Sequence, residues 1–219
     1  MKTLFLGDIH GCWGDLNDVL QRNKNTRIIQ VGDLGLGFNQ TYTYLNLNTG
    51  LWEAKIGKPD PTEFPKNFQF IRGNHDEPTT CRNHPNYLGD YGVSEDGIFF
   101  ISGAWSIDHG NRTIGVDWWD EEELDYPDLQ NAIELYEKIK PKIVVSHTAP
   151  SSICKILQGS HKKFYGSKTE HALETMWSIH KPKYWIFGHW HTVWSKNVLG
   201  TQFVCCAING KFKLDLEKC

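Results

Sequence analysis

Residues 70–76 read FIRGNHD, where a short, mostly apolar segment runs directly into glycine, asparagine, histidine and aspartate. Such an ending is typical of a surface turn, but the same polar side chains are also metal ligands. One stretch cannot separate the two possibilities. The rest of the chain can, because four other apolar runs end in a similar way.

The five runs share one feature: glycine or serine follows the apolar segment, and a potential metal ligand comes next. The runs span 2–6, 27–31, 68–72, 143–145 and 184–187, and the ligands after them are Asp8, Asp33, Asn74, His147 and His189. Two loops carry a second candidate two residues further on, His10 and His191. We expect the preceding glycines to let the backbone turn sharply, so that each side chain is presented and no bulky neighbour crowds it.

Segments with helical spacing, at 16–20, 129–139 and 170–179, alternate with these runs. The alternation predicts an α/β layered fold. Functional groups in open α/β sheets gather where loops leave the carboxyl ends of strands. We therefore expect the seven candidate ligands to lie together.

Two further expectations concern segments outside these runs. Asn209-Gly210, between the apolar segments 202–208 and 211–216, predicts a β-hairpin, which would make the sheet mixed. Residues 39–66 are polar and contain three prolines, so they predict an irregular excursion with room for a short helix. Because no repeat or linker is visible, we expect residues 1–219 to form one domain.

Composition excludes several classes of protein. The net charge of −3 gives no global basic field, so no strong nucleic-acid binding is expected. No apolar run approaches the roughly 20 residues that cross a bilayer, so no membrane association is expected. The six cysteines show no Cys-x-x-Cys spacing and no secreted-type framework. The interpretation is a cytoplasmic protein.

The donor types at the strand ends narrow the kind of site. Carboxylate, amide and imidazole groups suit zinc, manganese or iron, and they argue against a structural zinc site built from thiolates. Seven ligands exceed the capacity of one tetrahedral ion. They suit two ions with one carboxylate shared between them.

The motifs GDIHG (7–11), GD (32–33), GNHD (73–76), SHTAP (146–150) and GHWH (188–191) resemble, in order, those of the calcineurin-like metallophosphoesterases. The resemblance implies a four-layer α/β/β/α sandwich with two facing mixed sheets and a dinuclear centre, with manganese as first choice and iron, zinc, nickel or cobalt as alternatives. It implies that Asp8, His10 and His191 bind the first ion, that Asn74, His147 and His189 bind the second, and that Asp33 bridges them.

The same resemblance implies a phosphoesterase in which a metal-activated hydroxide attacks phosphorus and His75 protonates the leaving oxygen. Protein phosphatases of the superfamily extend the second motif to Gly-Asp-x-x-Asp-Arg-Gly, but Leu36 and Gly37 stand here at the Asp and Arg positions, and Asp76 replaces a glutamate. We therefore predict a phosphodiesterase. The alternatives are a phosphomonoesterase or protein phosphatase, a dinucleoside polyphosphate hydrolase, and a catalytically inactive binding protein on the same fold.

The expected substrate is a small phosphate ester, a nucleotide or a short oligonucleotide. The candidates to contact it are Arg72, His109, Arg112, Lys162 and Lys163. Each has an ordinary alternative: an ion pair for Arg72, a turn for 106–112 and a solvated loop for 159–168. In DWWDEEE (117–123), the tryptophans could stack on a base or pack internally, with the acids opening the next helix.

Overall fold

The computed structural model describes residues 2–38, 41–46, 51–56, 61, 63–159 and 167–218, with the backbone alone for 41–46 and 51–56. Its two larger sheets contain all five predicted runs as strands. The first sheet has the order β12 (Lys211–Asp215), β1 (Lys2–Leu6), β2 (Arg27–Gln30) and β5 (Phe68–Phe70). The last three strands are parallel, and β12 pairs with β1 in the antiparallel direction.

The second sheet is also mixed. Its order is β10 (Trp194–Val198), β11 (Thr201–Cys205), β9 (Tyr184–Phe187), β8 (Ile143–Ser146), β7 (Ile98–Ile101) and β6 (Tyr91–Val93). The four central strands run parallel, and the outer strands β10 and β6 are antiparallel to their neighbours.

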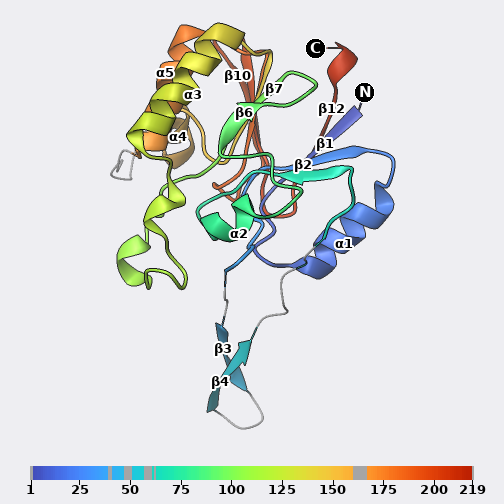
Figure 1. The fold of residues 1–219 in the computed structure, drawn as a ribbon, viewed down its shortest axis with the longest axis vertical. Helices are drawn as coiled ribbons and strands as arrows, with labels where there is room; N and C mark the ends of the chain where they lie inside the picture. The colour runs from blue at the N-terminus through green and yellow to red at the C-terminus, as the bar shows by residue number, and fades with distance from the viewer. Residues whose placement is uncertain are drawn as a thin grey trace.

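Helices cover the outer faces of the two sheets (Figure 1). They are α1 (Trp13–Arg22), α2 (Pro78–Arg82), α3 (Tyr126–Ile139), α4 (Ser151–Gln158) and α5 (Lys168–Ile179), with short 3₁₀ helices at His109–Asn111, Asp120–Glu122 and Leu216–Lys218. Among the described residues, no helix combines the length and the apolar character needed to cross a membrane.

Strand alternation builds a core of three layers, because successive side chains point to opposite faces of a sheet. In β1, Leu4 and Leu6 pack with α1, whereas Phe5 between them packs toward the second sheet. In β8, Val145 joins that inner layer, and Val144 faces α3 to α5. The predicted four-layer α/β/β/α sandwich with two facing mixed sheets is confirmed.

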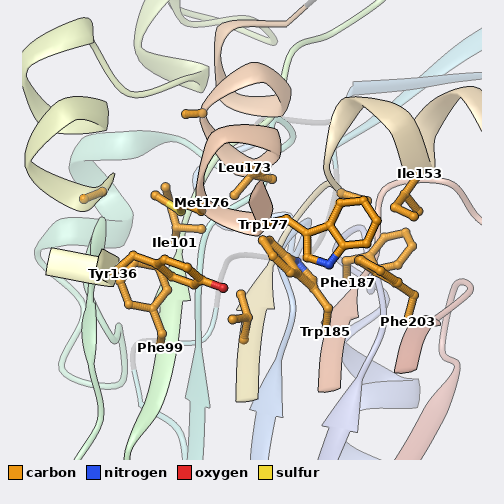
Figure 2. Packing of buried hydrophobic residues seen from close by; sticks show 14 of the residues in the cluster. Phe99, Ile101, Tyr136, Ile153, Leu173, Met176, Trp177, Trp185, Phe187 and Phe203 are labelled. Carbon is orange, nitrogen blue, oxygen red and sulfur yellow. The ribbon is translucent and has the colours of Figure 1, made fainter. Parts of the chain in front are cut away.

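The outermost core layer lies between the second sheet and its helices (Figure 2). Trp177 of α5 packs edge-on against Phe203 at 5.3 Å between ring centroids, and Phe203 stacks on Trp185 at 5.8 Å. All three side chains are buried. This packing holds α5 against β11 and β9, and β9 leads directly to His189.

The predicted hairpin around Asn209-Gly210 is wrong. The turn forms, with Asn209 in the left-handed region (φ 54°), but β11 before it belongs to the second sheet and β12 after it to the first. Long-range pairing decides the outcome, because β1 offers β12 a free edge. The turn also binds the first motif loop, since Gly7 N donates to Gly210 O and Asn209 N to Asp8 O.

The excursion at 39–66 also differs from the expectation. Its described part contains a two-stranded antiparallel hairpin, β3 (Thr41–Asn46) and β4 (Leu51–Ile56), instead of a short helix. The threonine and tyrosine alternation in TYTYLN favours a strand, but the polar composition obscured it. In Figure 1 the hairpin extends away from the two larger sheets.

Candidate metal centre

The seven candidate ligands converge at the carboxyl ends of β1, β2, β5, β8 and β9. Within the described chain, histidine and acidic side chains form two adjoining groups whose ligand atoms lie within 4.8 Å of one another. The groups are Asp8, His10, Asp33 and His191, and Asp33, His147 and His189. Asp33 belongs to both, so the geometry is that of two neighbouring sites with one carboxylate in common.

In the first group, two imidazole nitrogens face each other. His10 Nε2 lies 3.0 Å from His191 Nε2, and His191 Nε2 lies 3.1 Å from Asp8 Oδ2. Ligand atoms on one tetrahedral or octahedral ion with bonds of about 2.1 Å stand roughly 3.0–3.4 Å apart. These two distances match that range, whereas His10 Nε2 lies further from the carboxylates, at 4.0 Å from Asp8 Oδ2 and 3.8 Å from Asp33 Oδ2. The group therefore has the donors for a divalent cation, with His10 slightly outside the ideal spacing.

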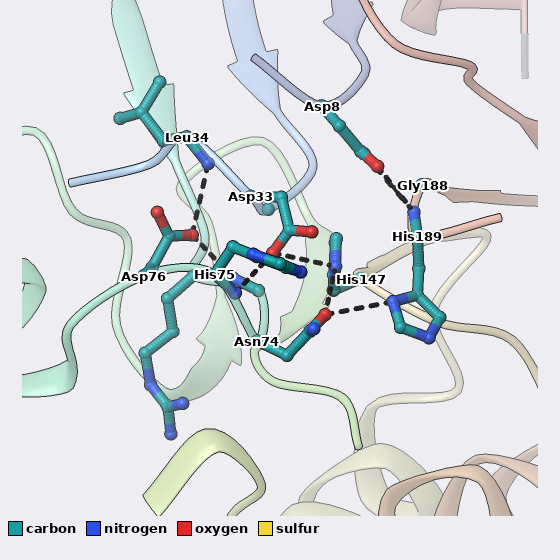
Figure 3. A network of polar contacts seen from close by, with 12 residues as sticks. Asp8, Asp33, Leu34, Asn74, His75, Asp76, His147, Gly188 and His189 are labelled. Carbon is teal, nitrogen blue, oxygen red and sulfur yellow. Dashed lines mark hydrogen bonds and ion pairs between the residues drawn. The ribbon is translucent and has the colours of Figure 1, made fainter. Parts of the chain in front are cut away.

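The second group has the same spacing and adds the amide of Asn74 (Figure 3). His147 Nε2 lies 3.2 Å from Asp33 Oδ1 and 3.2 Å from Asn74 Oδ1. His189 Nδ1 lies 3.0 Å from the same amide oxygen. One carboxylate, one amide and two imidazoles thus point at a common position.

The backbone of four candidate ligands is in the left-handed region. The φ angles are 48° for His10, 57° for Asp33, 67° for His189 and 49° for His191, four of the seven positive values at non-glycine residues in the described chain. Positive φ is uncommon for such residues, and backbone strain of this kind clusters at functional sites. The sharp turns are made largely by the ligands themselves.

The glycines before the ligands keep the site uncrowded, as expected, but most of them do not make a left-handed turn. Only Gly32 has a positive φ, 100°, whereas Gly73 and Gly188 do not. A Cβ atom on Gly73 would lie well under 3.0 Å from Asp33 Oδ1, one on Gly188 equally close to Asp8 Oδ1, and one on Gly32 to His147 Nδ1. Each of these three glycines leaves room for a ligand from another loop, whereas Gly7, before Asp8, lies against the backbone carbonyl of Ala207.

Two candidate ligands are oriented by hydrogen bonds to the side-chain atom that does not face the ion site. His147 Nδ1 lies 2.9 Å from Val31 O, which directs Nε2 toward Asp33. Asn74 Nδ2 donates to Ser106 Oγ at 2.9 Å, and Ser106 itself donates to the buried carboxylate of Glu122 through Oγ and, at 2.8 Å, through its backbone N–H. Such supporting contacts fix ligand orientation in metal sites.

Ser106 and Glu122 are not among the site residues that the sequence predicts. Glu122 belongs to the acidic run expected to open a helix, but α3 begins later, at Tyr126, with Asp125 as its cap. Glu123 is also used elsewhere, because it accepts hydrogen bonds from Ser167 Oγ and Thr169 N at the start of α5. No local signal separates these acids from solvated ones, since their partners are distant in sequence.

Asp76 connects the second and third motif loops. Its buried carboxylate accepts from Gly73 N and Gly35 N, both at 2.7 Å, from Leu36 N at 3.1 Å and from Leu34 N at 3.2 Å. Burial raises the pKa of Asp76 and the nearby Asp33 raises it further, while these backbone donors oppose the shift. Asp76 therefore positions both loops without contacting the candidate ion sites.

We expect Asp76→Asn to destabilise the metal-free protein by about 2–4 kcal/mol, because the amide NH₂ would face backbone donors in a buried site. Urea unfolding followed by circular dichroism measures the change. The control is Asp18→Asn on the exposed face of α1, where the pair with Arg22 contributes little. A loss below about 1 kcal/mol for Asp76→Asn would contradict the positioning role.

Charge in the centre is balanced between Asp33 and His147. Burial alone would raise the pKa of Asp33, but His147, His75 and His10 hold it well below its usual range. Burial would likewise lower the pKa of His147, but Asp33 raises it to about 9. In contrast, burial and the charge of His147 lower the pKa of His189 to about 3. A bound cation would replace the proton on His147 as the partner of Asp33.

His75 lies beside the ligands, and its side chain contacts Arg112. Arg112 Nη2 donates to His75 Nε2 at 2.9 Å and to Asp108 Oδ1 at 2.7 Å. Burial lowers the pKa of His75 to about 4, with Asp33 opposing the shift and Arg112 adding to it. Because a guanidinium cannot accept a hydrogen bond, His75 is neutral in this arrangement, with its proton on Nδ1.

The other predicted substrate contacts lie elsewhere. Arg72 is fully buried, pairs with Asp90 at 2.8 Å and donates to Glu122 O at 3.1 Å, which is the ion-pair alternative left open by the sequence. His109 is exposed, and its Nδ1 lies 2.9 Å from Ser106 O. Lys162 and Lys163 fall outside the described residues.

A pocket of about 380 Å³ opens onto the centre. Asp33, Asn74, His75, His189 and His191 form its metal side. The remaining described lining residues are Trp105, Ile107, Asp108, Arg112, Gln158, Glu170 and Trp190. Arg112 is thus the predicted substrate contact that lines the pocket, whereas Arg72 and His109 do not.

Comparison with known proteins gives a family match. The family sequence model of the calcineurin-like phosphoesterases matches residues 1–193, which include all five motif loops. Among curated proteins, no sequence matches this chain.

Two solved structures are similar at low sequence identity. One is a conserved uncharacterized protein, a "predicted phosphoesterase", from Streptococcus pneumoniae TIGR4, with 12% identity, a TM-score of 0.42 and coverage of 98% of this chain and 83% of that one. The other is GAP50, the anchor in the inner membrane complex of Plasmodium, with 13% identity, a TM-score of 0.42 and coverage of 94% and 71%. By the family match, the chain belongs to the calcineurin-like phosphoesterases.

Proposed function

We propose that this protein is a divalent-metal-dependent phosphoesterase whose first class of substrate is small phosphodiesters, including cyclic nucleotides and short oligonucleotides. The observation that carries the proposal is the convergence of donor atoms from four loops on two groups that share Asp33, with Asn74 from a fifth loop beside His147 and His189. Asp8, His10 and His191 would hold one ion, Asn74, His147 and His189 the other, and Asp33 both. The donor set suits manganese first, with iron, zinc, nickel or cobalt as alternatives.

When bound, two such cations would polarise the attacking and leaving oxygens of an in-line displacement and would make water acidic enough to react near neutral pH. The chain's own residues orient the ester and move the proton. Arg112 keeps Nε–H and part of Nη1 available beside its bonds to Asp108 and His75, so it can bind a phosphoryl oxygen. When Arg112 turns to that oxygen, the unprotonated His75 Nε2 becomes free to take up the proton that the attacking water loses and to pass it to the leaving oxygen.

Charge at the pocket favours a diester. Arg112 is the one lysine or arginine among the described lining residues. Leu36 is buried, and Gly37 (φ 70°) packs against Glu77 and Thr80, so the second motif loop presents no extra cation or acid there. A singly charged diester needs less compensation than a doubly charged monoester. This argues against the phosphomonoesterase, protein phosphatase and polyphosphate hydrolase alternatives.

Two further observations bear on the proposal. All seven candidate ligands are present and close together, whereas an inactive binding protein on this fold would be free to lose them.

The proposed location is the cytoplasm. The five described cysteines Cys12, Cys81, Cys154, Cys205 and Cys206 are free thiols, which fits that reducing compartment.

The test compares a diester with a monoester. We expect the Mn²⁺-loaded protein to hydrolyse bis-p-nitrophenyl phosphate with a kcat/KM at least about tenfold above that for p-nitrophenyl phosphate, which corresponds to about 1.4 kcal/mol. A chelator should abolish the activity, and Mn²⁺ should restore it. Turnover of the monoester alone would rule out the diester preference. Metal content well below one ion per chain with no turnover would favour the inactive binding protein.

A further inference from the structure

Asp108 lines the pocket beside Arg112, the one lysine or arginine among the described residues of its wall. The side chain of Asp108 is 51% exposed, and its Oδ1 lies 2.7 Å from Arg112 Nη2. The same nitrogen donates to His75 Nε2 at 2.9 Å. The guanidinium that we assign to the phosphoryl oxygen of the substrate therefore carries a carboxylate on another of its edges.

Asp108 is not used for the local role that its position offers. It comes directly before the 3₁₀ helix His109–Asn111, and aspartate at the start of a helix commonly caps the free backbone N–H groups. Here its side chain makes no capping hydrogen bond and pairs with Arg112 instead. An ion pair of this exposure contributes little to stability. Neither capping nor stability thus accounts for an acid at this place on the pocket wall.

The segment around Asp108 keeps the carboxylate in place. The ring of His109 contacts Trp105 and Trp118, with centroids 5.4 Å and 5.7 Å apart. Arg112 N donates to His109 O at 3.0 Å, which closes the turn that holds Asp108 and Arg112 four residues apart. The two opposite charges are therefore presented to the pocket together.

The distance between Asp108 and a bound phosphoryl oxygen has an upper limit. Two nitrogens of one guanidinium are about 2.3 Å apart, and a charge-assisted hydrogen bond adds about 2.8 Å. Because Asp108 Oδ1 lies 2.7 Å from Nη2, an oxygen bound to another nitrogen of Arg112 lies within about 8 Å of that carboxylate. Repulsion between two negative charges at this distance, in surroundings between protein surface and water, changes an equilibrium or rate constant about fivefold.

Resting on the proposed phosphoesterase function, we propose that Asp108 is a specificity-determining residue that disfavours doubly charged phosphate monoesters. Its carboxylate repels each negative charge of the ester, so a monoester loses about twice as much binding free energy as a diester. Arg112 attracts both kinds of ester, and Asp108 separates them. Selection by repulsion of the wrong ligand, in addition to attraction of the right one, is a common source of specificity.

The experiment measures kcat/KM of the Mn²⁺-loaded protein for p-nitrophenyl phosphate and for bis-p-nitrophenyl phosphate at pH 8, where the monoester carries two charges. Asp108→Asn removes the charge and keeps an oxygen that can accept from Arg112. We expect the ratio of the monoester value to the diester value to rise about fivefold. An unchanged or lower ratio would overturn the inference.

Salt and a charge-conserving variant separate charge from geometry. In 1 M NaCl the Debye length falls to about 3 Å, so the ratios of wild type and Asp108→Asn should converge. Asp108→Glu keeps the charge and should have a ratio close to that of wild type. A difference that persists in 1 M NaCl, or an equal rise in Asp108→Glu, would trace the effect to altered geometry and overturn the inference.

The matched control is Asp18→Asn in α1. Asp18 forms an exposed ion pair with Arg22, also four residues apart, and neither residue lines the pocket. This variant removes the same charge from the chain as Asp108→Asn does. Its ratio should equal that of wild type, and a rise as large as that of Asp108→Asn would overturn the assignment of the effect to the pocket.

A binding measurement separates this inference from the proposed activity. Calorimetric titration of the Mn²⁺-loaded protein with methyl phosphate and dimethyl phosphate at pH 8 needs no turnover. Asp108→Asn should strengthen the binding of methyl phosphate about fivefold more than that of dimethyl phosphate. If this difference is found and no ester is turned over, the proposed activity fails and the role of Asp108 stands. If esters are turned over and Asp108→Asn changes neither comparison, the activity stands and the role of Asp108 fails.

Discussion

Replacing Asp33 with asparagine is expected to remove both cations and to lower kcat/KM on a diester by about 10³-fold or more, about 4 kcal/mol of transition-state stabilisation. Asp33 is the residue common to both ligand groups. Asparagine keeps the shape of the side chain and tolerates the left-handed backbone at φ 57°, so the change removes charge and one oxygen ligand with little strain. Elemental analysis after gel filtration measures the metal content.

The matched comparison is His75→Ala, which removes a neighbouring side chain that is not in either ligand group. It should retain close to two ions per chain and slow turnover by roughly 10²–10⁴-fold, the usual contribution of a positioned acid. Asp33→Asn with two ions still bound would contradict the shared position. Loss of metal from His75→Ala would contradict the role of His75 as a proton donor.

A single methyl group at Gly73 is expected to disrupt the centre nearly as strongly. The Cβ of Gly73→Ala would fall well under 3.0 Å from Asp33 Oδ1, with His147 Nε2 also within that distance. Asp33 Oδ1 cannot yield freely, because it accepts from His75 N at 2.7 Å. We expect a loss of about 10²-fold in metal affinity and a destabilisation of about 1–3 kcal/mol.

The control for this variant is Gly14→Ala in α1. No neighbouring atom lies within 4 Å of the added Cβ there, and alanine should stabilise the helix by up to about 1 kcal/mol. Isothermal calorimetry with Mn²⁺ and urea unfolding give the two quantities. Gly73→Ala with unchanged metal affinity would show that the loops move apart without cost.

Much of the site could be predicted because its parts are local in sequence. A buried strand followed by a small residue and a ligand is visible in five short stretches, and the carboxyl ends of neighbouring parallel strands must meet. Strands β1 and β9 begin and end where the apolar runs do. The four layers came from the resemblance, since periodicity does not say which strands share a sheet.

The features of the fold and the site that the sequence did not predict depend on contacts between residues that are distant along the chain. Asn209-Gly210 has the residue types of a hairpin turn, but β12 pairs with the free edge of β1 and not with the strand before the turn. Glu122 accepts a hydrogen bond from Ser106, which in turn accepts one from Asn74. No residue near position 122 in the sequence indicates this chain of contacts. The glycines were expected both to turn the chain and to leave the ligands uncrowded, and the second role explains Gly73 and Gly188 through neighbours that are distant in sequence.

The contacts between glycines and ligands have an evolutionary consequence. Each such contact joins two loops: Gly32 with His147, Gly73 with Asp33 and Gly188 with Asp8. If His147 were replaced by a smaller residue in some lineage, Gly32 would no longer need to be a glycine to make room for it. Selection on Gly32 would then relax, although its sequence neighbour Asp33 stayed under constraint. In descendants that lose the metal centre, substitutions would thus accumulate together at residues that touch in space, and not together at residues of the same sequence motif.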